Sequence, residues 1–275
     1  MDDETDPRLA DFVALNDPAR RRQVERSGGY FVVEGVLAVE RLLALPQWEV
    51  RSIALLPRLA DRLAAAIEER FGAPTGAPDC PVSVVDQDAL NRVVGFDLHR
   101  GALASVTRRP PPPLDDVDPA DLDAVRLLVM TEGINDHENL GGLYRNAAAF
   151  GVDAMVLDPT SADPFYRRSV RVSLGHVLAV PTLMVPALPA GIEALQARGV
   201  TVVALTPTGD VDLGDLSRSS LGSGPVAVLV GAEGPGLSPA ALTAADHRVR
   251  ITMATGVDSL NVATATAVAL HHFSR

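Results

Sequence analysis

The stretch that most restricts the fold is a short apolar run followed by a glycine-rich loop. Residues 226–230 read VAVLV, a continuous apolar and β-branched pattern that is typical of a strand buried on both faces. The run stops at GAEGPG, residues 231–236, where three glycines and a proline favour tight turns over an extended strand. A strand buried on both faces needs helices on either side, so this stretch predicts an α/β fold with a parallel sheet.

A second loop follows the same logic further along the chain. We predict a short strand over Val249–Met253, a glycine-containing loop, and an alanine-rich helix over Val262–Leu270. The two loops carry a carboxylate, Glu233, together with the hydroxyl of Ser259 and the carboxamide of Asn261. Because ligands of doubly wound sheets bind beyond the carboxyl ends of the strands, these side chains are candidates for a binding site. Asn261 also fits an ordinary N-cap of the last helix.

Several common nucleotide and hydrolase motifs do not fit these loops. The chain contains no lysine, which excludes a P-loop. GAEGPG lacks the glycine spacing of a dinucleotide-binding fingerprint, and Ser259 does not lie in a G-x-S-x-G elbow. Taken alone, the loops are equally compatible with ordinary glycine-rich turns of an α/β protein.

Three motifs in fixed order resemble the SpoU (TrmH-type) family of RNA ribose 2′-O-methyltransferases. The first, NLGGLYRNAAAFG, runs from Asn139 to Gly151 and places Arg145 six residues after the asparagine. The second is the apolar strand that ends in Gly231–Gly236. The third combines Ile251 and Met253 with the Ser-Leu-Asn-Val of residues 259–262. Together they cover roughly the last 150 residues.

This resemblance implies a fold and an activity. It implies S-adenosylmethionine-dependent methylation of a ribose 2′-hydroxyl in rRNA or tRNA, and a homodimer that completes each active site across the subunit interface. It also implies a deep trefoil knot in the C-terminal parallel-sheet domain, although ordinary topology rules argue against threaded connections. The alternative is a non-catalytic RNA-binding paralogue that keeps the fold.

The resemblance also implies roles for particular residues. The matching catalytic positions are Asn139, Arg145, Glu233, Ser259 and Asn261, and the matching cofactor-binding positions are Thr206, Gly231, Ile251, Met253 and Leu260. A guanidinium is a poor general base because its pKa is above about 12. We therefore expect Arg145 to hold the target phosphate and stabilise charge on the attacking oxygen, and Glu233 to orient Arg145 or relay a proton.

Composition divides the chain into two modules. Strands and helices alternate through residues 1–108, a predicted small α/β domain that resembles the family's N-terminal RNA-binding domain. Residues 109–124 form a linker that combines a polyproline stretch with five aspartates, which predicts a stiff, extended spacer. Residues 125–275 carry the three motifs, together with a predicted helix over Leu140–Phe150, and form the predicted methyltransferase domain.

Candidate RNA contacts are arginines, although the net charge of −11 opposes binding to a polyanion. Arg20, Arg21 and Arg22 lie in a predicted helix that begins at Asp17. Arg167 and Arg168 lie in a predicted loop, residues 161–171, beside Phe165 and Tyr166, and arginine with aromatic rings suits looped RNA. Solvated basic surfaces are the alternative for both groups.

The remaining composition bears on location and partners. The only cysteine is Cys80, so neither an intrachain disulfide nor a cysteine-based zinc site is expected. No apolar run is long enough to span a membrane, and the acidic start MDDETDPRLADF is unlike a signal or transit peptide. We therefore expect a cytoplasmic protein without a metal cofactor or a membrane partner.

Overall fold

The chain forms two compact units in the computed structural model, which describes residues 6–17, 19, 29–118 and 124–274. The first unit comprises Met1–Pro110 together with Phe165–Ala179, and the second comprises Pro111–Pro164 and Val180–Arg275. The first unit is therefore discontinuous in sequence. The predicted basic helix with Arg20, Arg21 and Arg22 lies outside the described residues.

The first unit is built on a mixed five-stranded sheet in the order β1-β5-β2-β4-β3. The strands are β1 (Tyr30–Glu34), β2 (Val50–Leu55), β3 (Gly76–Ala77), β4 (Cys80–Val84) and β5 (Ala102–Thr107). The helices are η1 (Pro7–Phe12), α2 (Val36–Leu43), α3 (Pro57–Phe71), α4 (Gln87–Val94), α6 (Arg167–Val172) and η4 (His176–Leu178). In α3, Leu59, Leu63 and Ile67 recur every fourth residue and are buried, as expected for an amphipathic helix on a sheet.

The segment Phe165–Ala179 packs onto this first sheet through aromatic and polar contacts. The Phe165 ring stacks on Phe31 at 5.0 Å and meets the edge of Trp48 at 5.2 Å. Trp48 donates from its indole nitrogen to the Leu178 carbonyl at 2.8 Å. Gly175 approaches the Ala38 backbone so closely that a Cβ there would lie 2.9 Å from the Ala38 Cα. The segment is thus an integral part of the first unit.

The second unit is a seven-stranded sheet in the order β10-β12-β9-β11-β6-β7-β8, with every neighbouring pair parallel. The strands are β6 (Leu127–Glu132), β7 (Ala154–Leu157), β8 (Thr182–Met184), β9 (Thr201–Leu205), β10 (Val211–Asp212), β11 (Val226–Gly231) and β12 (His247–Arg250). The predicted strand at residues 226–230 is confirmed as β11, which is buried and lies between β9 and β6.

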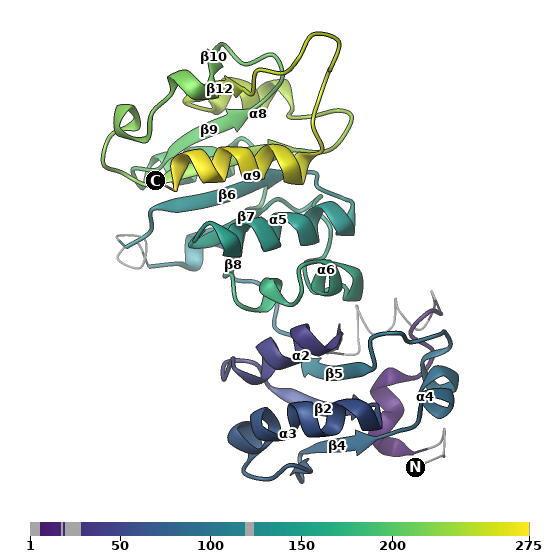
Figure 1. Cartoon of the computed structure of the whole chain (residues 1–275). Coiled ribbons are helices and arrows are strands. Elements are labelled where there is room, and N and C mark those ends of the chain that lie inside the picture. The colour runs from purple at the N-terminus through teal and green to yellow at the C-terminus, as the bar shows by residue number, and fades with distance from the viewer. Residues whose placement is uncertain (1–5, 18, 20–28, 119–123, 275) are drawn as a thin grey trace. The chain divides into compact units, whose positions relative to one another are not determined.

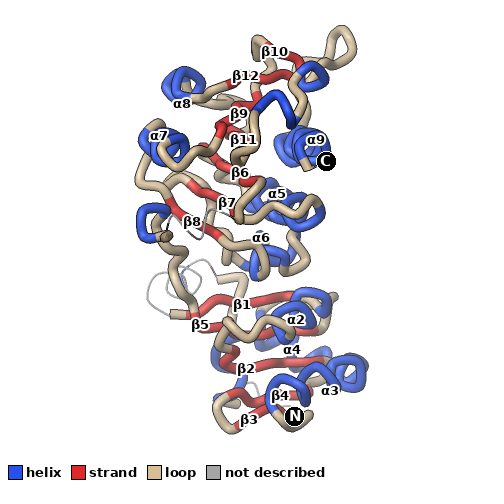
Figure 2. The backbone as a smooth tube through the Cα atoms, turned by 90° about the vertical axis from the view of Figure 1, so that its left-hand side faces the viewer, coloured by secondary structure: helices blue, strands red, loops and turns tan. Residues whose placement is uncertain are grey.

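Helices cover both faces of this sheet. They are α5 (His137–Ala149), α7 (Ala190–Gln196), α8 (Pro239–Ala244) and α9 (Val262–Phe273), with short 3-10 turns η2 (Leu114–Asp116), η5 (Leu213–Asp215) and η6 (Arg218–Leu221). Figure 2 shows α5 and α9 on one face and α7 and α8 on the other. In Figure 1, α9 runs beside α5. The α/β class with a parallel-sheet C-terminal domain is therefore confirmed.

Three element predictions needed correction. The strand predicted at Val249–Met253 is β12, which spans His247–Arg250. Its pairing with β9 stops at Val249 and its pairing with β10 stops at Arg250, which leaves Ile251–Met253 without a partner strand. The helix predicted from Leu140 begins at His137, since Asp136 caps it. The predicted loop 161–171 contains most of α6, which packs on residues of the first sheet that are distant in sequence.

Candidate functional site

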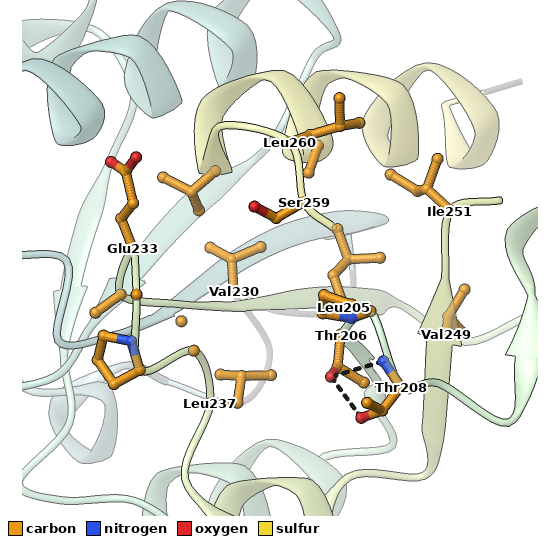
Figure 3. A pocket seen from close by; sticks show the side chains of 18 of the residues that line it. Leu205, Thr206, Thr208, Val230, Glu233, Leu237, Val249, Ile251, Ser259 and Leu260 are labelled. Carbon is orange, nitrogen blue, oxygen red and sulfur yellow. Dashed lines mark hydrogen bonds between the residues drawn. The ribbon is translucent and has the colours of Figure 1, made fainter. Parts of the chain in front are cut away.

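A cavity of about 440 Å³ opens at the carboxyl ends of β9, β11 and β12 in the second unit. Figure 3 shows side chains from all three strand ends around it. The five positions predicted to bind a cofactor all line this cavity: Thr206, Gly231, Ile251, Met253 and Leu260. Sequence reasoning missed Thr208, Leu237 and Leu242, which also line it. Of these three, only Thr208 had a local sequence signal: it follows Thr206 by two residues, a spacing that is typical of a hydroxyl-stabilised turn.

The Gly231–Gly236 loop requires glycine where it leaves β11. A Cβ on Gly231 would lie 2.4 Å from the carbonyl carbon of Gly236 and 2.5 Å from the Leu237 nitrogen, closer than real Cβ contacts come. The Gly236 nitrogen donates to the Ala232 carbonyl at 2.9 Å, which closes the loop. Gly234 has a φ of +92°, a conformation that favours glycine. The loop is thus folded back tightly and presents Glu233 at the cavity edge.

The wall formed after β9 is held to β12 by backbone contacts. The Thr206 nitrogen donates to the Val249 carbonyl at 2.9 Å. The Thr206 hydroxyl lies 3.2 Å from the Thr208 hydroxyl and accepts from the Thr208 nitrogen at 3.4 Å (Figure 3). A Cβ on Gly209 would lie 2.4 Å from the Val249 carbonyl carbon, so only glycine allows this close approach. The turn at residues 206–209 is therefore held against β12 at its first and its last residue.

The cavity lining restricts the charge of its ligand. Apolar side chains such as Val230, Leu237 and Ile251 alternate with backbone and hydroxyl groups, and Glu233 is the only charged side chain among the lining residues, all of which are described. A polyphosphate would have no cation here to offset its charge. Apolar walls with a few hydrogen-bonding groups suit an aromatic ring, and a single carboxylate suits a neutral or cationic ligand.

A chain of hydrogen bonds joins three of the predicted catalytic residues. Asn139 donates from Nδ2 to Glu233 Oε2 at 3.0 Å, and Asn261 donates from Nδ2 to Asn139 Oδ1 at 2.8 Å. Asn261 Oδ1 in turn accepts from the nitrogens of Ala263 and Thr264, at 2.9 and 3.3 Å. The predicted N-cap role of Asn261 is therefore confirmed. Each carboxamide has one consistent orientation, so the chain ends with Glu233 accepting.

The local structure of α5 places Asn139 in this chain. Asp136 caps the helix by accepting from the nitrogens of Glu138 and Asn139, at 2.7 and 2.9 Å. The same face of α5 packs closely against α9 at Gly142. A Cβ added at Gly142 would lie 3.0 Å from the Ala263 Cβ, so a larger residue would crowd α9. Asn146 then donates to the Ala263 carbonyl at 2.7 Å. Positions i, i+3 and i+7 of α5 thus share one seam along α9.

The other two predicted catalytic residues lie differently. Ser259 lines the cavity beside Leu260 (Figure 3). Arg145 is exposed, is not among the residues that line the cavity, and makes no hydrogen bond or ion pair within the described chain. At about 3.6 residues per turn, six residues separate it onto a different face of α5 from Asn139. Glu233 is therefore partnered by Asn139, not by Arg145.

Arg167 and Arg168 lie in α6 of the first unit, away from the cavity residues in sequence. Arg167 donates to Glu34 Oε2 at 3.1 Å, and Arg171 lies 3.6 Å from the other oxygen of this carboxylate, which is 4% exposed. The Arg167 guanidinium also lies over the Phe96 ring at 4.5 Å. Burial of the Arg167 guanidinium lowers its pKa, and the nearby Glu34 carboxylate offsets part of this decrease. Arg167 is thus held by structural contacts, while Arg168 is exposed.

No helix among the described residues is long and apolar enough to cross a membrane. In the same part of the chain, no group of three or more His, Cys, Asp or Glu side chains is arranged to hold a metal ion.

Known proteins resemble this chain both in the region that carries the three motifs and along almost its whole length. The model of the SpoU rRNA methylase family matches residues 126–271. An uncharacterised tRNA/rRNA methyltransferase of Mycobacterium tuberculosis is 42% identical over 273 residues, which cover 99% of this chain and 90% of the relative. A 23S rRNA (guanosine-2′-O-)-methyltransferase of Photobacterium profundum is 29% identical over 87% of this chain and 95% of its own length.

Solved structures share the fold along almost the entire chain. An AdoMet-bound rRNA methyltransferase from Sinorhizobium meliloti superposes with a TM-score of 0.77 at 26% identity, covering 99% of this chain and 96% of that one. The SpoU methyltransferase AviRb from Streptomyces viridochromogenes gives a TM-score of 0.74 at 24% identity, with 98% of both chains covered, and supports the fold. With a family model that spans the cavity loops and the Asn139 helix, and with relatives that match from end to end, this chain belongs to the SpoU rRNA methylase family.

Proposed function

We propose that this protein transfers a methyl group from S-adenosylmethionine to a ribose 2′-hydroxyl of rRNA or tRNA. The observation that carries the proposal is the hydrogen-bonded chain Asn261–Asn139–Glu233, which ends at the edge of an apolar cavity. Membership of the SpoU family supports methyl transfer to RNA. The Photobacterium relative, named as a guanosine 2′-O-methyltransferase, supports the 2′-oxygen as the acceptor.

The cavity suits S-adenosylmethionine better than a nucleoside polyphosphate. Thr206, Gly231, Ile251, Met253 and Leu260 would hold it through backbone groups and apolar contacts with the adenine ring. When bound, this cofactor supplies an electrophilic methyl group on a sulfonium. The absence of arginine from the lining residues, all of them described, removes the counter-charge that ATP would need. The Sinorhizobium structure, which is described with AdoMet bound, supports the same choice.

The polar side chains would divide the work of preparing the ribose. Asn139 and Asn261 hold Glu233 in one orientation, so that its second carboxylate oxygen is available to accept a proton directly or through water. Ser259 shapes the loop over the cavity. Arg145 would grip the target phosphate and stabilise the developing alkoxide, since a guanidinium donates but does not accept.

Arg145 would serve this site from a second subunit. It is exposed, makes no hydrogen bond or ion pair in the described chain, and lies on a different face of α5 from Asn139. A homodimer that places Arg145 of one protomer at the cavity of its partner accounts for both observations. The α9 residue Val268, 42% exposed, adds an apolar contact for such an interface.

Complementation between inactive variants tests the shared site. Arg145→Ala and Glu233→Ala chains are each expected to lose most of their methyl-transfer activity. Mixing them under subunit exchange would form heterodimers in which one cavity has both Glu233 and a wild-type Arg145 from the other chain. Partial recovery of methyl transfer is expected. No recovery, with heterodimers demonstrated by mass spectrometry, would mean that each chain uses its own Arg145.

The first unit would select the RNA. Its five-stranded sheet, with Arg168 exposed on α6 and the arginines at residues 20–22, would supply the contacts to phosphate. We also infer, from family membership, that the C-terminal segment forms a trefoil knot. A cytoplasmic location follows from an RNA substrate of this class.

The direct test is methyl transfer to RNA. The full chain would be incubated with tritiated S-adenosylmethionine and total RNA from cells that lack the protein. Nuclease digestion and mass spectrometry are expected to show one 2′-O-methylated nucleoside. A base-methylated product would contradict the ribose assignment. Binding of RNA and S-adenosylhomocysteine without any transfer would favour the non-catalytic paralogue.

A further inference from the structure

A buried carboxylate outside the cavity organises the entry to α5. Asp158 directly follows β7, is 4% exposed, and forms no ion pair among the described residues. Its Oδ1 accepts from the Gly133 nitrogen at 2.9 Å, and its Oδ2 accepts from the Thr160 nitrogen at 3.1 Å. The hydroxyls of Thr160 and Ser161 also donate to it. Four donors therefore satisfy one buried charge.

Ser161 extends this network to the next peptide group. Because its proton goes to Asp158, its oxygen is left to accept, from the Thr131 hydroxyl at 2.9 Å and from the Ile134 nitrogen at 3.2 Å. The Ala162 nitrogen donates to the Ile134 carbonyl at 2.7 Å. The loop after β7 thus holds the backbone of Gly133 and Ile134 at three points.

The peptide groups of Gly133 and Ile134 lead directly into α5. Gly133 has a φ of +68°, and Ile134 is 2% exposed, so the chain turns sharply and is anchored there. Two residues later Asp136 caps α5, and Asn139 lies in its first turn beside Glu233. We propose that Asp158 is a positioning residue, which fixes the β6–α5 loop and thereby sets the distance between Asn139 and Glu233. Its kinetic consequence rests on the proposed function.

Asp153, an exposed aspartate that directly precedes β7, provides a control at the opposite end of β6. Asp153 Oδ2 accepts from the nitrogens of Arg126 and Leu127, at 2.8 and 3.0 Å, where β6 begins. Both aspartates therefore bind backbone nitrogens at the ends of β6, and the six residues of this strand, roughly 20 Å, separate the two ends. Loss of Asp153 should loosen β6 without reaching the loop that carries Asn139.

The experiment compares Asp158→Ala, Asp158→Asn and Asp153→Ala in the full chain. S-adenosylhomocysteine binding is measured by calorimetry, and kcat by tritium transfer to rRNA and tRNA transcripts. We expect Asp158→Ala to bind the cofactor product within about threefold of wild type while kcat falls on the order of ten- to a hundredfold, the scale of a small misplacement. Asp158→Asn, which keeps an acceptor for Gly133, should lose less, and Asp153→Ala should keep kcat even where its Tm falls.

Amide hydrogen exchange gives a second reading that does not need the reaction. Exchange at Gly133 and Ile134 should accelerate in the Asp158 variants and stay at the wild-type rate in Asp153→Ala. Unchanged exchange at these two amides, or an equal loss of kcat in Asp153→Ala, would overturn the proposal. Should Asp158→Ala fail to fold, Asp158→Asn decides by the same criteria. A wild-type chain without methyl transfer would overturn the proposed function alone, because the exchange comparison still decides on Asp158.

Discussion

At the scale of single residues, a substitution of Arg145 should change turnover without changing the stability of the fold. It is exposed and makes no hydrogen bond or ion pair in the described part of the chain, and alanine keeps the helix propensity of α5. Arg145→Ala should therefore keep the wild-type Tm and S-adenosylhomocysteine affinity while turnover falls on the order of 10²-fold, the effect of removing one charge-stabilising donor. Methyl-transfer kinetics with thermal melting checks this.

Arg145→Lys extends the test of the arginine. A point charge does not reproduce the bidentate fork of a guanidinium on a phosphate, so this variant should also remain poor. Near-normal turnover of Arg145→Ala would show that the residue is an ordinary surface cation, whereas near-normal turnover of Arg145→Lys alone would show that a point charge is sufficient.

Cys80 provides a residue-scale test that depends on pH. It is 2% exposed, and burial, followed by the neighbouring charge of Asp79, raises the pKa of its thiol to about 12. At pH 8 the folded protein should have only about one thiolate in ten thousand, so Ellman's reagent should react only as fast as the chain unfolds. The only cysteine in the chain gives an unambiguous signal.

The sign of the accompanying stability change follows from the same shift. An unfolded cysteine ionises near pH ~8.5, whereas the folded thiol keeps its proton. Stability is therefore fully present below that pH and falls as the pH rises above it. Urea titrations of wild type and Cys80→Ala between pH 7 and about 10 should show a larger loss in the wild type, because the loss from buried Tyr144, whose pKa is also raised by burial, is common to both chains. Rapid labelling of the native protein would contradict the burial.

At the scale of elements, the turn after β11 should tolerate no side chain at its first position. Gly231→Ala would force a Cβ to within 2.4 Å of the Gly236 backbone, so the loop must open. We expect at least a tenfold loss of S-adenosylhomocysteine affinity, since this loop forms one wall of the cavity. Gly214→Ala is a suitable control, because its Cβ would meet only a side-chain oxygen, at 3.3 Å. Equal binding by both variants would refute the rigid turn.

The elements also show what local sequence predicts and what it does not. The buried strand β11 and the cap at Asn261 were predicted correctly, because an apolar run and an asparagine before an alanine-rich segment act over a few residues. Helix α6 was predicted as a loop. Two of its six residues, Arg167 and Arg171, pair with Glu34, more than a hundred positions earlier, and no local pattern reveals such a partner.

The site divides along the same line. Loops at the carboxyl ends of parallel strands meet at one edge of the sheet, so the gathering of Thr206, Gly231 and Ile251 could be predicted from their positions at strand ends. The pairing of Glu233 with Asn139, and not with Arg145, could not, because it depends on which face of α5 meets α9. Asp158 carried one local signal, a Thr and a Ser two and three residues later, as in an Asx-type turn.

At the scale of the whole molecule, removing the first 110 residues tests where the cofactor binds. The cavity is lined only by residues between 205 and 265, so binding should persist in a chain that starts at residue 111. That chain would keep Phe165 but lose Phe31 and Trp48, which cover its ring. We therefore expect aggregation, relieved by Phe165→Ser, with S-adenosylhomocysteine affinity near that of the full chain.

Light scattering and calorimetry on the shortened chain check both parts of this prediction. Its Phe165→Ser form should be monodisperse and bind as the full chain does. A soluble, folded variant without affinity would mean that the first unit contributes to the cofactor site.

The return of Phe165–Ala179 to the first unit also has a consequence for the timing of synthesis. The five strands of the first sheet are complete once Thr107 has been made. Phe31 and Trp48, however, remain without their partners until Phe165 and Leu178 have been synthesised. A ribosome therefore exposes a nearly finished module with an uncovered apolar surface while β6, α5 and β7 are translated. The N-terminal unit therefore begins first but is completed only after part of the second unit has been made, so nascent chains stalled before residue 165 should be the ones that chaperones retain.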